Sequence, residues 1–243
     1  MQHRYVFVGC LHQSGGSLLH KCLRDHPQIS AFGRTGVPGD EGQYLQTVFP
    51  PDTAHGGPGQ FGFDPAAHLT EGSPLVSDAH RDQLLWQWGM HWDAGKPVRV
   101  EKSSANLIRM RFLLAMFPSA SFIVLLRHPV ATAYATQQWS RATVGTLLHH
   151  WVACHELFAS DRRWLPRLLL LRYEDLVAEP VATLARAFGF LHLEPVPLRR
   201  AIEQNTNEPY YQRWEADDRR EIEERFEVRV NAFGYSLLRL RGR

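Results

Sequence analysis

Residues 9–17, GCLHQSGGS, join a short apolar segment to a helical one through a turn rich in glycine and serine. A strand, such a turn and a helix are typical of a phosphate-binding loop, because backbone N–H groups and the positive end of the helix face one anion. The backbone of residues 14–17 is therefore a candidate anion site, with the Ser17 hydroxyl as a further donor. Gln13 and Gly16 stand where such loops usually carry a lysine or an arginine.

The loop differs from that of the ATP-dependent kinases. Their loop follows the pattern G-x-x-x-x-G-K-[ST], whose lysine reaches the β- and γ-phosphates of the nucleotide. The segment SGGS, residues 14–17, places Gly16 at the lysine position. The sequence therefore disfavours an ordinary ATPase or a nucleotide-dependent kinase, while the anion site itself remains.

The elements around the loop alternate between strand and helix patterns. Short apolar segments predict buried strands at residues 4–9, 98–101, 120–126 and 167–173. Helical patterns occupy residues 17–26, 81–92, 104–117, 129–139 and 143–165. This alternation predicts an α/β fold with a parallel sheet flanked by helices on both faces.

Polar residues follow each predicted strand. The segments are GCLHQSGGS, EKSS, RHP and RYEDL, in order along the chain. Because the carboxyl ends of parallel strands meet at one edge of a sheet, we expect these segments to converge on one crevice.

The chain of 243 residues is long enough for one large domain, and we predict a single domain over residues 1–243. Residues 32–75 contain many glycines and prolines and are expected to form a long loop or cap, a kind of segment that often carries function. Residues 215–230 have a charged helical pattern, typical of a solvated face.

The composition bounds the partners and the compartment. The 27 basic and 25 acidic residues nearly balance, which does not indicate nucleic-acid binding. The three cysteines favour a reducing compartment, and no stretch approaches the about 20 apolar residues of a membrane span. We expect a soluble, cytoplasmic protein without a signal peptide, and the sequence indicates no oligomeric state.

A histidine and cysteine cluster lies in the segment HHWVACHE. His150 and Cys154 are four residues apart and can share one helix face, as metal ligands do. The sequence offers no complete ligand set around them, so we expect no metal and assign the helix to packing or to the acceptor pocket.

The loop and three further segments together resemble a family. The loop GCLHQSGGSLL is similar to the 5′-phosphosulfate loop of sulfotransferases, often written [KR]-S-G-T-[ST]. In the same order as in that family follow EKSSANLIRMRFLLAMFP, FIVLLRHPVATAYATQQW and LRYEDLVAEPVATLARAFGFL. The resemblance spans roughly residues 4–191. It implies the P-loop NTPase-like sulfotransferase fold and is nearest to the bacterial and Golgi-type enzymes.

The resemblance implies a reaction as well as a fold. The donor in this family is 3′-phosphoadenosine 5′-phosphosulfate (PAPS), and its sulfuryl group passes in line to a hydroxyl or an amine without a metal. The acceptor can be a small molecule, a natural product or a glycan. Positioning and electrostatic stabilisation are expected to dominate catalysis, as in phosphoryl transfer.

The resemblance also assigns donor-binding residues. Arg127 would bind the 3′-phosphate, Tyr173 would lie near the adenine, and Arg213 in the tail would contact the donor from a lid. The family usually has a serine eight residues after this arginine; Ala135 stands there, and Thr132 or Ser140 are the possible substitutes. The 5′-phosphosulfate would lie on Gln13, Ser14, Gly15, Gly16, Ser17 and Leu18.

The catalytic assignments depart from the family at one position. Gln13 stands at the catalytic lysine or arginine and brings no charge, so Lys102 or His12 would have to replace it. Glu41 is the first choice for the general base and Glu101 the alternative, since the family uses a glutamate or a histidine. A second hypothesis is a weakened protein that binds a nucleotide or another anion without efficient transfer.

Overall fold

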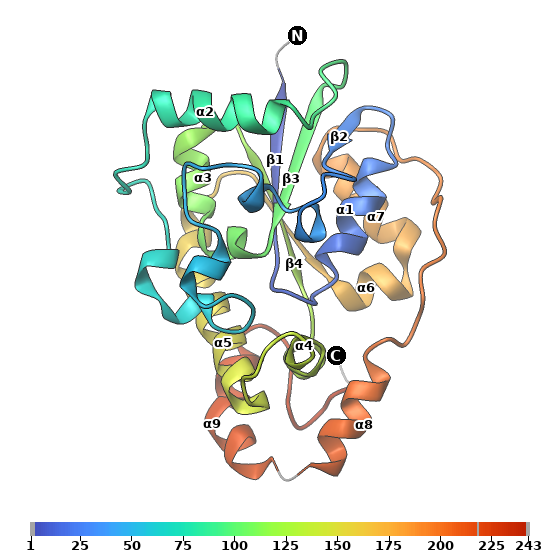
Figure 1. Ribbon diagram of the computed structural model, residues 1–243. Coiled ribbons are helices and arrows are strands. Elements are labelled where there is room, and N and C mark those ends of the chain that lie inside the picture. The colour runs from blue at the N-terminus through green and yellow to red at the C-terminus, as the bar shows by residue number, and fades with distance from the viewer. Residues whose placement is uncertain (1–2, 218, 242–243) are drawn as a thin grey trace.

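A parallel sheet forms the centre of the molecule in the computed structural model, which describes residues 3–217 and 219–241. Within these residues the sheet has five strands in the order β2-β3-β1-β4-β5, and every neighbouring pair is parallel. The strands run from the N-terminal end at the top of Figure 1 down to the phosphate-loop candidate. Their bounds are β1 Arg4–Gly9, β2 Ile29–Ala31, β3 Val98–Ser103, β4 Ser121–Leu126 and β5 Leu168–Arg172.

Helices lie on both sides of the sheet and below its carboxyl ends (Figure 1). In chain order the α-helices of the described residues are α1 Gly16–Arg24, α2 Asp78–Gly89, α3 Met110–Met116, α4 Pro129–Gln137, α5 Val144–Asp161, α6 Tyr173–Ala178, α7 Pro180–Phe190, α8 Glu208–Ala216 and α9 Arg220–Asn231. Position 218, inside the charged segment 215–230, lies outside the described residues.

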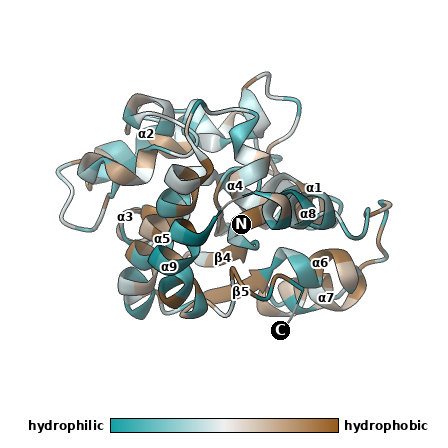
Figure 2. Ribbon diagram, turned by 90° about the horizontal axis from the view of Figure 1, so that it is seen from below, coloured by the Kyte–Doolittle hydropathy of each residue, from teal (hydrophilic) through white to brown (hydrophobic). Residues whose placement is uncertain are grey.

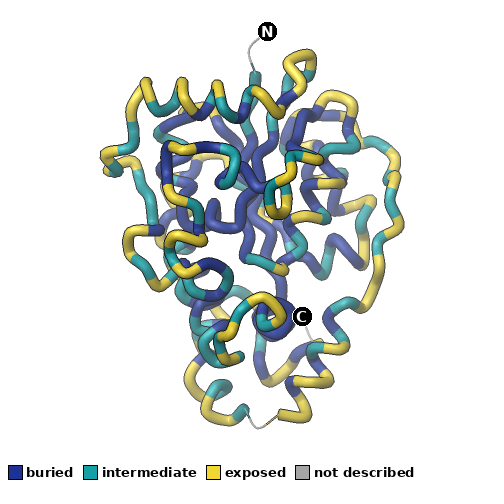
Figure 3. Tube along the Cα trace, in the orientation of Figure 1, coloured by how far each residue is buried: buried dark blue, intermediate teal, exposed yellow. Residues whose placement is uncertain are grey.

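Two hydrophobic cores fill the two faces of the sheet. Alternate residues of a strand point to opposite faces, so Phe7 of β1 packs in the core with α2, α3 and α5. Its neighbours Val6 and Val8 pack in the other core, with α1, α6 and α7. The strands β1 to β4 are mostly buried and the outer helix surfaces exposed in Figure 3, and β4 and β5 are among the most apolar segments in Figure 2.

The expected cap, residues 32–75, lies beside the front of the sheet as a series of short turns (Figure 1). Its 3-10 helices are η1 Pro38–Asp40, η2 Gly42–Tyr44, η3 Asp52–His55, η4 Phe61–Phe63 and η5 Pro65–Ala67. A buried carboxylate attaches the end of the cap to the helices. Asp161 of α5 contacts His68 Nε2 at 2.7 Å and Arg111 Nη1 of α3 at 3.2 Å.

The α/β fold class predicted from the sequence is confirmed, with helices on both faces of a parallel sheet. Two details differ. The strand β2 was not predicted, because Ile29–Ala31 is too short to show a pattern. The helix expected at 104–117 is a 3-10 turn, η6 Ser104–Ile108, and the shorter α3, since Arg109 between them has non-helical φ and ψ of −127° and 8°. That the chain forms one domain stays a prediction.

None of the helices in the described residues is long and apolar enough to span a bilayer.

Removing the Asp161 carboxylate should loosen the cap. In Asp161→Ala, His68 and Arg111 lose a partner that is 2% exposed, and we expect the free energy of unfolding to fall by about 2–4 kcal/mol. Urea denaturation measures the loss, and limited proteolysis should cut within residues 32–75 faster. The control is Glu156→Ala on the same helix, which removes an exposed ion pair to Arg229 and should cost at most about 1 kcal/mol. Equal losses in both variants would contradict this role.

Candidate active site

The phosphate-loop candidate makes a tight turn between β1 and α1. Gln13 has a positive φ of 61°, and its side chain is exposed. The next residue, Ser14, is buried, and its N–H donates to the Leu11 carbonyl at 3.1 Å. The helix then begins at Gly16, so the positive end of its dipole faces the turn and favours an anion there.

Glycine at position 15 lets the loop lie directly on a tyrosine ring. Gly15 has a φ of 88°, and a Cβ there would lie only 2.2 Å from Cδ2 of Tyr173. Tyr173 begins α6 and is buried, and its hydroxyl lies 2.8 Å from the Thr206 hydroxyl. Tyr173, directly after β5, therefore packs against the loop. The sequence predicts that these two segments lie close together, because both follow parallel strands whose carboxyl ends meet at one edge of the sheet.

Lys102 of β3 brings a cation to the position where the loop lacks one. A side chain at Gly16 would place its Cβ 2.2 Å from Sγ of Cys10 and 3.6 Å from Cδ of Lys102. The aliphatic part of the Lys102 side chain therefore lies close to where the side chain of a lysine at position 16 would start. Its Nζ reaches to 3.5 Å from Oγ of Ser17. Burial lowers the pKa of Lys102, but the nearby carboxylate of Glu41 raises it further, so the pKa is raised and the ammonium stays charged.

Glu41 at the edge of the cap is held by four donors. Its Oε1 accepts from Lys102 Nζ and from the Ser104 hydroxyl, both at 2.9 Å. Its Oε2 accepts from Gln43 Nε2 at 2.6 Å and from the Ser104 N–H at 3.2 Å. Glu41 and Lys102 are both buried, and their ion pair joins the cap to the carboxyl end of β3.

Glu101 is the second carboxylate beneath the cap. Its Oε1 accepts from the Gly42 N–H at 3.0 Å and the Ser103 hydroxyl at 2.5 Å, and its Oε2 accepts from Asn106 Nδ2 at 2.5 Å. Burial raises its pKa to about 7, while the hydrogen bonds from Ser103 and Asn106 act in the opposite direction. The residue supports the fold of the cap against β3.

Arg127 follows β4 and faces the phosphate-loop candidate. Its Nη1 donates to the Gln13 carbonyl at 2.6 Å, and its Nε donates to Oδ1 of Asn207 at 2.8 Å. A longer bond of 3.4 Å joins Nη2 to the Thr206 carbonyl, and the guanidinium lies 4.4 Å from the centre of the Tyr173 ring. The loop, β4 and the segment before α8 therefore meet at one arginine.

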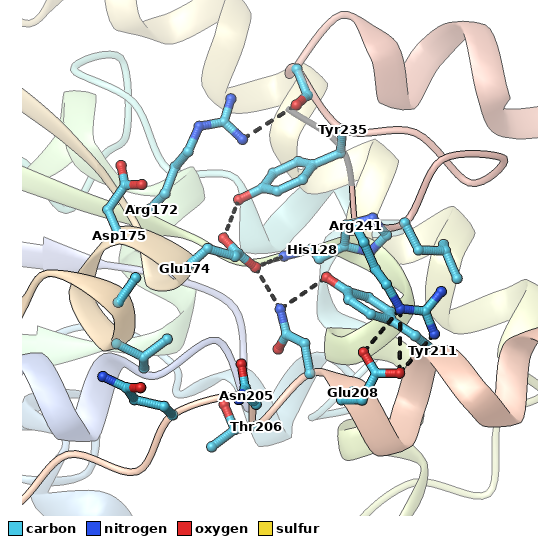
Figure 4. A pocket seen from close by; sticks show the side chains of 16 residues that line it. His128, Arg172, Glu174, Asp175, Asn205, Thr206, Glu208, Tyr211, Tyr235 and Arg241 are labelled. Atoms are coloured by element: carbon cyan, nitrogen blue, oxygen red, sulfur yellow. Dashed lines mark hydrogen bonds and ion pairs between the residues drawn. The ribbon is translucent and has the colours of Figure 1, made fainter.

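Asn207 links Arg127 to the half-buried carboxylate of Glu174. Its Nδ2 donates to Oε1 of Glu174 at 2.8 Å and to the Tyr211 hydroxyl at 3.1 Å. Glu174 also accepts from the His128 N–H at 2.9 Å and from the Tyr235 hydroxyl at 2.9 Å (Figure 4). These residues border a cavity of about 660 Å³, which is also lined by Arg172, Asp175, Val177, Ala178, Gln204, Asn205, Thr206, Glu208, Gly234, Leu240 and Arg241.

Helix α4 offers threonines near the position where the family carries a serine. Ala135 itself is buried. Thr132 donates to the Arg127 carbonyl at 3.5 Å, and Ser140 accepts from a neighbouring N–H after the helix. Thr136 reaches the loop, since its hydroxyl donates to the His12 carbonyl at 3.4 Å. No motif in the sequence points to Thr136.

Arg213 lies on α8 and contacts α4. Its guanidinium lies 4.4 Å from the centre of the Tyr134 ring and donates to Gln137 Oε1 at 3.0 Å. The lid role that the resemblance implies for Arg213 stays a prediction.

His12 precedes Gln13 in the loop and contacts a buried carboxylate of the cap. Its Nε2 lies 2.9 Å from Oδ2 of Asp52, whose side chain is 0% exposed. The other Asp52 oxygen accepts from the Tyr44 hydroxyl at 2.6 Å. The second ring nitrogen, Nδ1, is buried and has no hydrogen-bond partner among residues 3–217 and 219–241.

The histidine and cysteine cluster on α5 takes part in packing. His150 Nε2 accepts from the Gly62 N–H at 3.1 Å, and Sγ of Cys154 lies 3.4 Å from the same nitrogen. The described part of the chain contains no group of three or more histidine, cysteine or acidic side chains placed to hold a metal ion.

The structure thus brings most of the expected residues to one edge of the sheet. Residues 13–17, Lys102, Glu41, Arg127 and Tyr173 meet there. Sequence reasoning missed the other contributors, which lie in irregular segments without a motif. They are Asp52 and Tyr44 in the cap, Thr136 on α4, and Thr206 and Asn207 before α8.

The raised pKa of Glu101 makes a prediction about stability and pH. Because burial raises this pKa from 4.5 to about 7, the protonated form stabilises the fold at low pH, and that stabilisation is lost as the pH rises through about 7. At about 1.4 kcal/mol per pH unit the full effect is on the order of 3 kcal/mol. Between pH 5 and 8 the wild type should therefore lose stability relative to Glu101→Gln. Urea denaturation at four pH values tests this, and parallel curves would contradict it.

The comparisons with known proteins concern the family and the fold. The model of a sulfotransferase family matches residues 5–197. A sulfotransferase from Alicyclobacillus acidocaldarius has a TM-score of 0.53 and 15% identity, with 96% of each chain covered. The sulfotransferase domain of the Synechococcus PCC 7002 olefin synthase has the same TM-score and identity, over 90% of this chain and 97% of that domain.

A sulfotransferase from Mycobacterium avium covers all of this chain and 79% of its own, with a TM-score of 0.52 and 14% identity. At these identities the structural likeness shows the fold alone. Sequence comparison with curated proteins finds no match. The family model covers most of the chain, from β1 to beyond α7, and all four motif segments lie within it. The chain therefore belongs to the sulfotransferase family and has its P-loop NTPase-like fold.

Proposed function

We propose that this protein transfers a sulfuryl group from PAPS to a hydroxyl or an amine of a small-molecule, natural-product or glycan acceptor. The observation that carries the proposal is Lys102. Its charged Nζ lies 3.5 Å from Ser17 Oγ, at the start of the helix that follows the glycine turn. A cation, a hydroxyl and backbone amides that point at one place are what a phosphosulfate needs.

The donor would lie across the carboxyl edge of the sheet. The turn at residues 14–17, the Ser17 hydroxyl and Lys102 would hold the 5′-phosphosulfate, and Arg127 would hold the 3′-phosphate through its remaining N–H groups. Tyr173 and Thr206, whose hydroxyls lie 2.8 Å apart, would face the adenosine.

In-line displacement then needs little covalent chemistry from the protein. The acceptor oxygen forms a bond to sulfur while the bond from sulfur to the bridging phosphate oxygen breaks. Negative charge grows on that oxygen, and Lys102 with the loop amides would stabilise it. Glu41, whose four donors include Lys102, would keep the ammonium aimed at the loop.

A second candidate function is nucleotide or anion binding with weak transfer. Gln13 favours it, because its exposed side chain supplies no charge where the family carries a lysine or an arginine. A charged hydrogen bond is about twice as strong as a neutral one, so its loss near the leaving group would slow the reaction.

We also propose that the protein is located in the cytoplasm. Cys10, Cys22 and Cys154 are all free and buried, which supports the cytoplasmic location expected from the sequence.

Binding of adenosine 3′,5′-bisphosphate, the product nucleotide, tests the proposal. At 100 times its dissociation constant a ligand of the folded state adds about 2.7 kcal/mol of stability, so the melting temperature should rise. In Lys102→Ala, transfer from PAPS to a panel of phenols, alcohols and amines should fall by about 10²-fold or more. Lys21→Ala, an exposed lysine on α1, is the control and should change neither quantity.

Two outcomes would change the conclusion. No thermal shift at millimolar nucleotide would contradict the proposed donor. A wild type that binds the nucleotide but transfers nothing, together with a Gln13→Arg variant that does transfer, would favour the weakened binding protein.

Asn207 should matter for nucleotide affinity through Arg127. In Asn207→Ala the Nε of Arg127 loses its acceptor at 2.8 Å, and the guanidinium is less well oriented for a phosphate. We expect the dissociation constant of the bisphosphate to rise about 5-fold, roughly 1 kcal/mol, by isothermal titration calorimetry. Gln204→Ala, an exposed residue on the same cavity, is the matched control. Unchanged affinity in Asn207→Ala would show that the loop alone positions Arg127.

A further inference from the structure

We propose that a smaller cavity, at the edge of the sheet away from the phosphate-loop candidate, binds a phosphate monoester. The cavity has a volume of about 340 Å³ and lies at the amino ends of β1, β3 and β4, at the top of Figure 1. Cationic, hydroxyl and apolar side chains line it, and no acidic one does among the described residues. The inference goes beyond the proposed sulfuryl transfer, because no residue of that site takes part in it.

Two arginines reach this cavity from one face of the sheet. Arg4 begins β1, and Val6, two residues further along the strand, packs in the core with α1, α6 and α7. Since alternate residues of a strand point to the same face, Arg4 lies on this face too, and its Nη1 donates to the Leu191 carbonyl at 2.6 Å. Arg167 precedes β5, and its Nε donates to Oγ of Ser121 on β4 at 3.0 Å. The two guanidinium groups therefore come from the strands that flank β4.

Neither guanidinium group is neutralised by a carboxylate. Within residues 3–217 and 219–241, Arg4 and Arg167 form no ion pair, and each guanidinium makes a single hydrogen bond, to an uncharged acceptor. An arginine has five N–H donors in a planar fork, so most of them are left for a ligand. Arg229 on the outer helix α9 differs, since it contacts the carboxylate of Glu156. Two arginines at one cavity without an acid repel each other, and an anion bound there would offset that repulsion.

A third arginine adds positive charge next to the cavity. His3 lines the cavity, and its Nε2 lies 2.9 Å from Nη2 of Arg99 on β3. Burial and the positive charge of Arg99 lower the pKa of His3, so its ring is mostly neutral at pH 7. Arg99 also has no ion pair in the described part of the chain. The cavity therefore lies in a region of positive potential, which favours an anion.

The remaining lining indicates the rest of the ligand. Val6, Val98 and Leu191 are each at most 2% exposed and give the cavity apolar walls. Ser119 and Ser121 offer hydroxyl hydrogens as neutral donors. Ligand cavities of about 300–1,000 Å³ usually combine apolar walls with a few polar groups, and this one is at the small end of that range. The lining thus fits a small organic ester better than a free ion.

The charge of the arginines favours phosphate over sulfate. A phosphate monoester carries a charge of about −1.5 to −2 at pH 7, whereas a sulfate monoester carries a single negative charge. The arginine fork matches phosphate oxygens in pairs, and charged hydrogen bonds are about twice as strong as neutral ones. The sulfate ester that the proposed reaction would form should therefore bind here more weakly.

An NMR titration of the ¹⁵N-labelled full chain with phenyl phosphate, phenyl sulfate and inorganic phosphate tests the site. Amide shifts of residues 3–6 and 119–121 report on this cavity, and those of residues 14–17 report on the phosphate-loop candidate. We expect phenyl phosphate to shift the first set with saturation. Phenyl sulfate and inorganic phosphate should each bind there about 10-fold more weakly, because the first has less charge and the second has no ring to contact the apolar walls.

Substitutions test the two arginines. In Arg167→Gln and in Arg4→Gln, the dissociation constant of phenyl phosphate at this cavity should rise about 10-fold or more, because each variant loses charged hydrogen bonds. Arg167 is exposed, so its variant should fold like the wild type and decides the outcome if Arg4→Gln unfolds. The control is Arg162→Gln, which removes an exposed arginine of η7 Arg162–Trp164 outside the cavity and should leave the dissociation constant unchanged.

The inference would be overturned by an absence of saturable shifts at residues 3–6 and 119–121, or by an affinity that Arg167→Gln leaves unchanged. Equal weakening in Arg162→Gln would also overturn it, because only the overall charge would then matter. Phenyl sulfate or inorganic phosphate that binds as tightly as phenyl phosphate would contradict the assigned ligand. Failure of the proposed function is a separate result, since it would appear as absence of binding of the bisphosphate nucleotide.

Discussion

The buried ion pair between Lys102 and Glu41 is the interaction on which the rest of the site depends. Two charges out of water are stable only with close geometry and additional donors. Here the side chains are 3% and 8% exposed, their atoms lie 2.9 Å apart, and Ser104 and Gln43 complete the coordination of the carboxylate. The pair therefore fixes the cap against β3 while it aims a cation at the phosphate loop.

This arrangement explains how the loop can lack a cation of its own. Gly16 and Cys10 pack so closely that a side chain in the loop would collide with the sulfur. The charge comes instead from the neighbouring strand, which runs parallel to β1 with Lys102 beside Val8 in register. A lysine held by a carboxylate has less freedom than one on a loop, so fixing its position would cost less entropy on binding of the proposed donor.

The sequence was sufficient for β1, β3, β4 and β5 and for the residues at their carboxyl ends, because these strands are apolar and each stops at polar residues such as Lys102 and Arg127. It did not predict the three-residue strand β2. It was not sufficient for partners that come from irregular segments. Asp52 and Asn207 lie in stretches without periodicity, and their contacts with His12 and Arg127 span 40 and 80 residues. Such pairings depend on how the cap and the segment before α8 fold back, which no local pattern records.

The turn at residues 12–17 connects the cap to the start of α1. The side chain of His12 contacts Asp52 of the cap, and the backbone from residue 14 onward leads into the helix. Gln13 lies between the two with a φ of 61°. In the proposed reaction a neutral Gln13 is tolerable because Lys102, whose Nζ lies 3.5 Å from Ser17 Oγ, would supply the cation from the neighbouring strand.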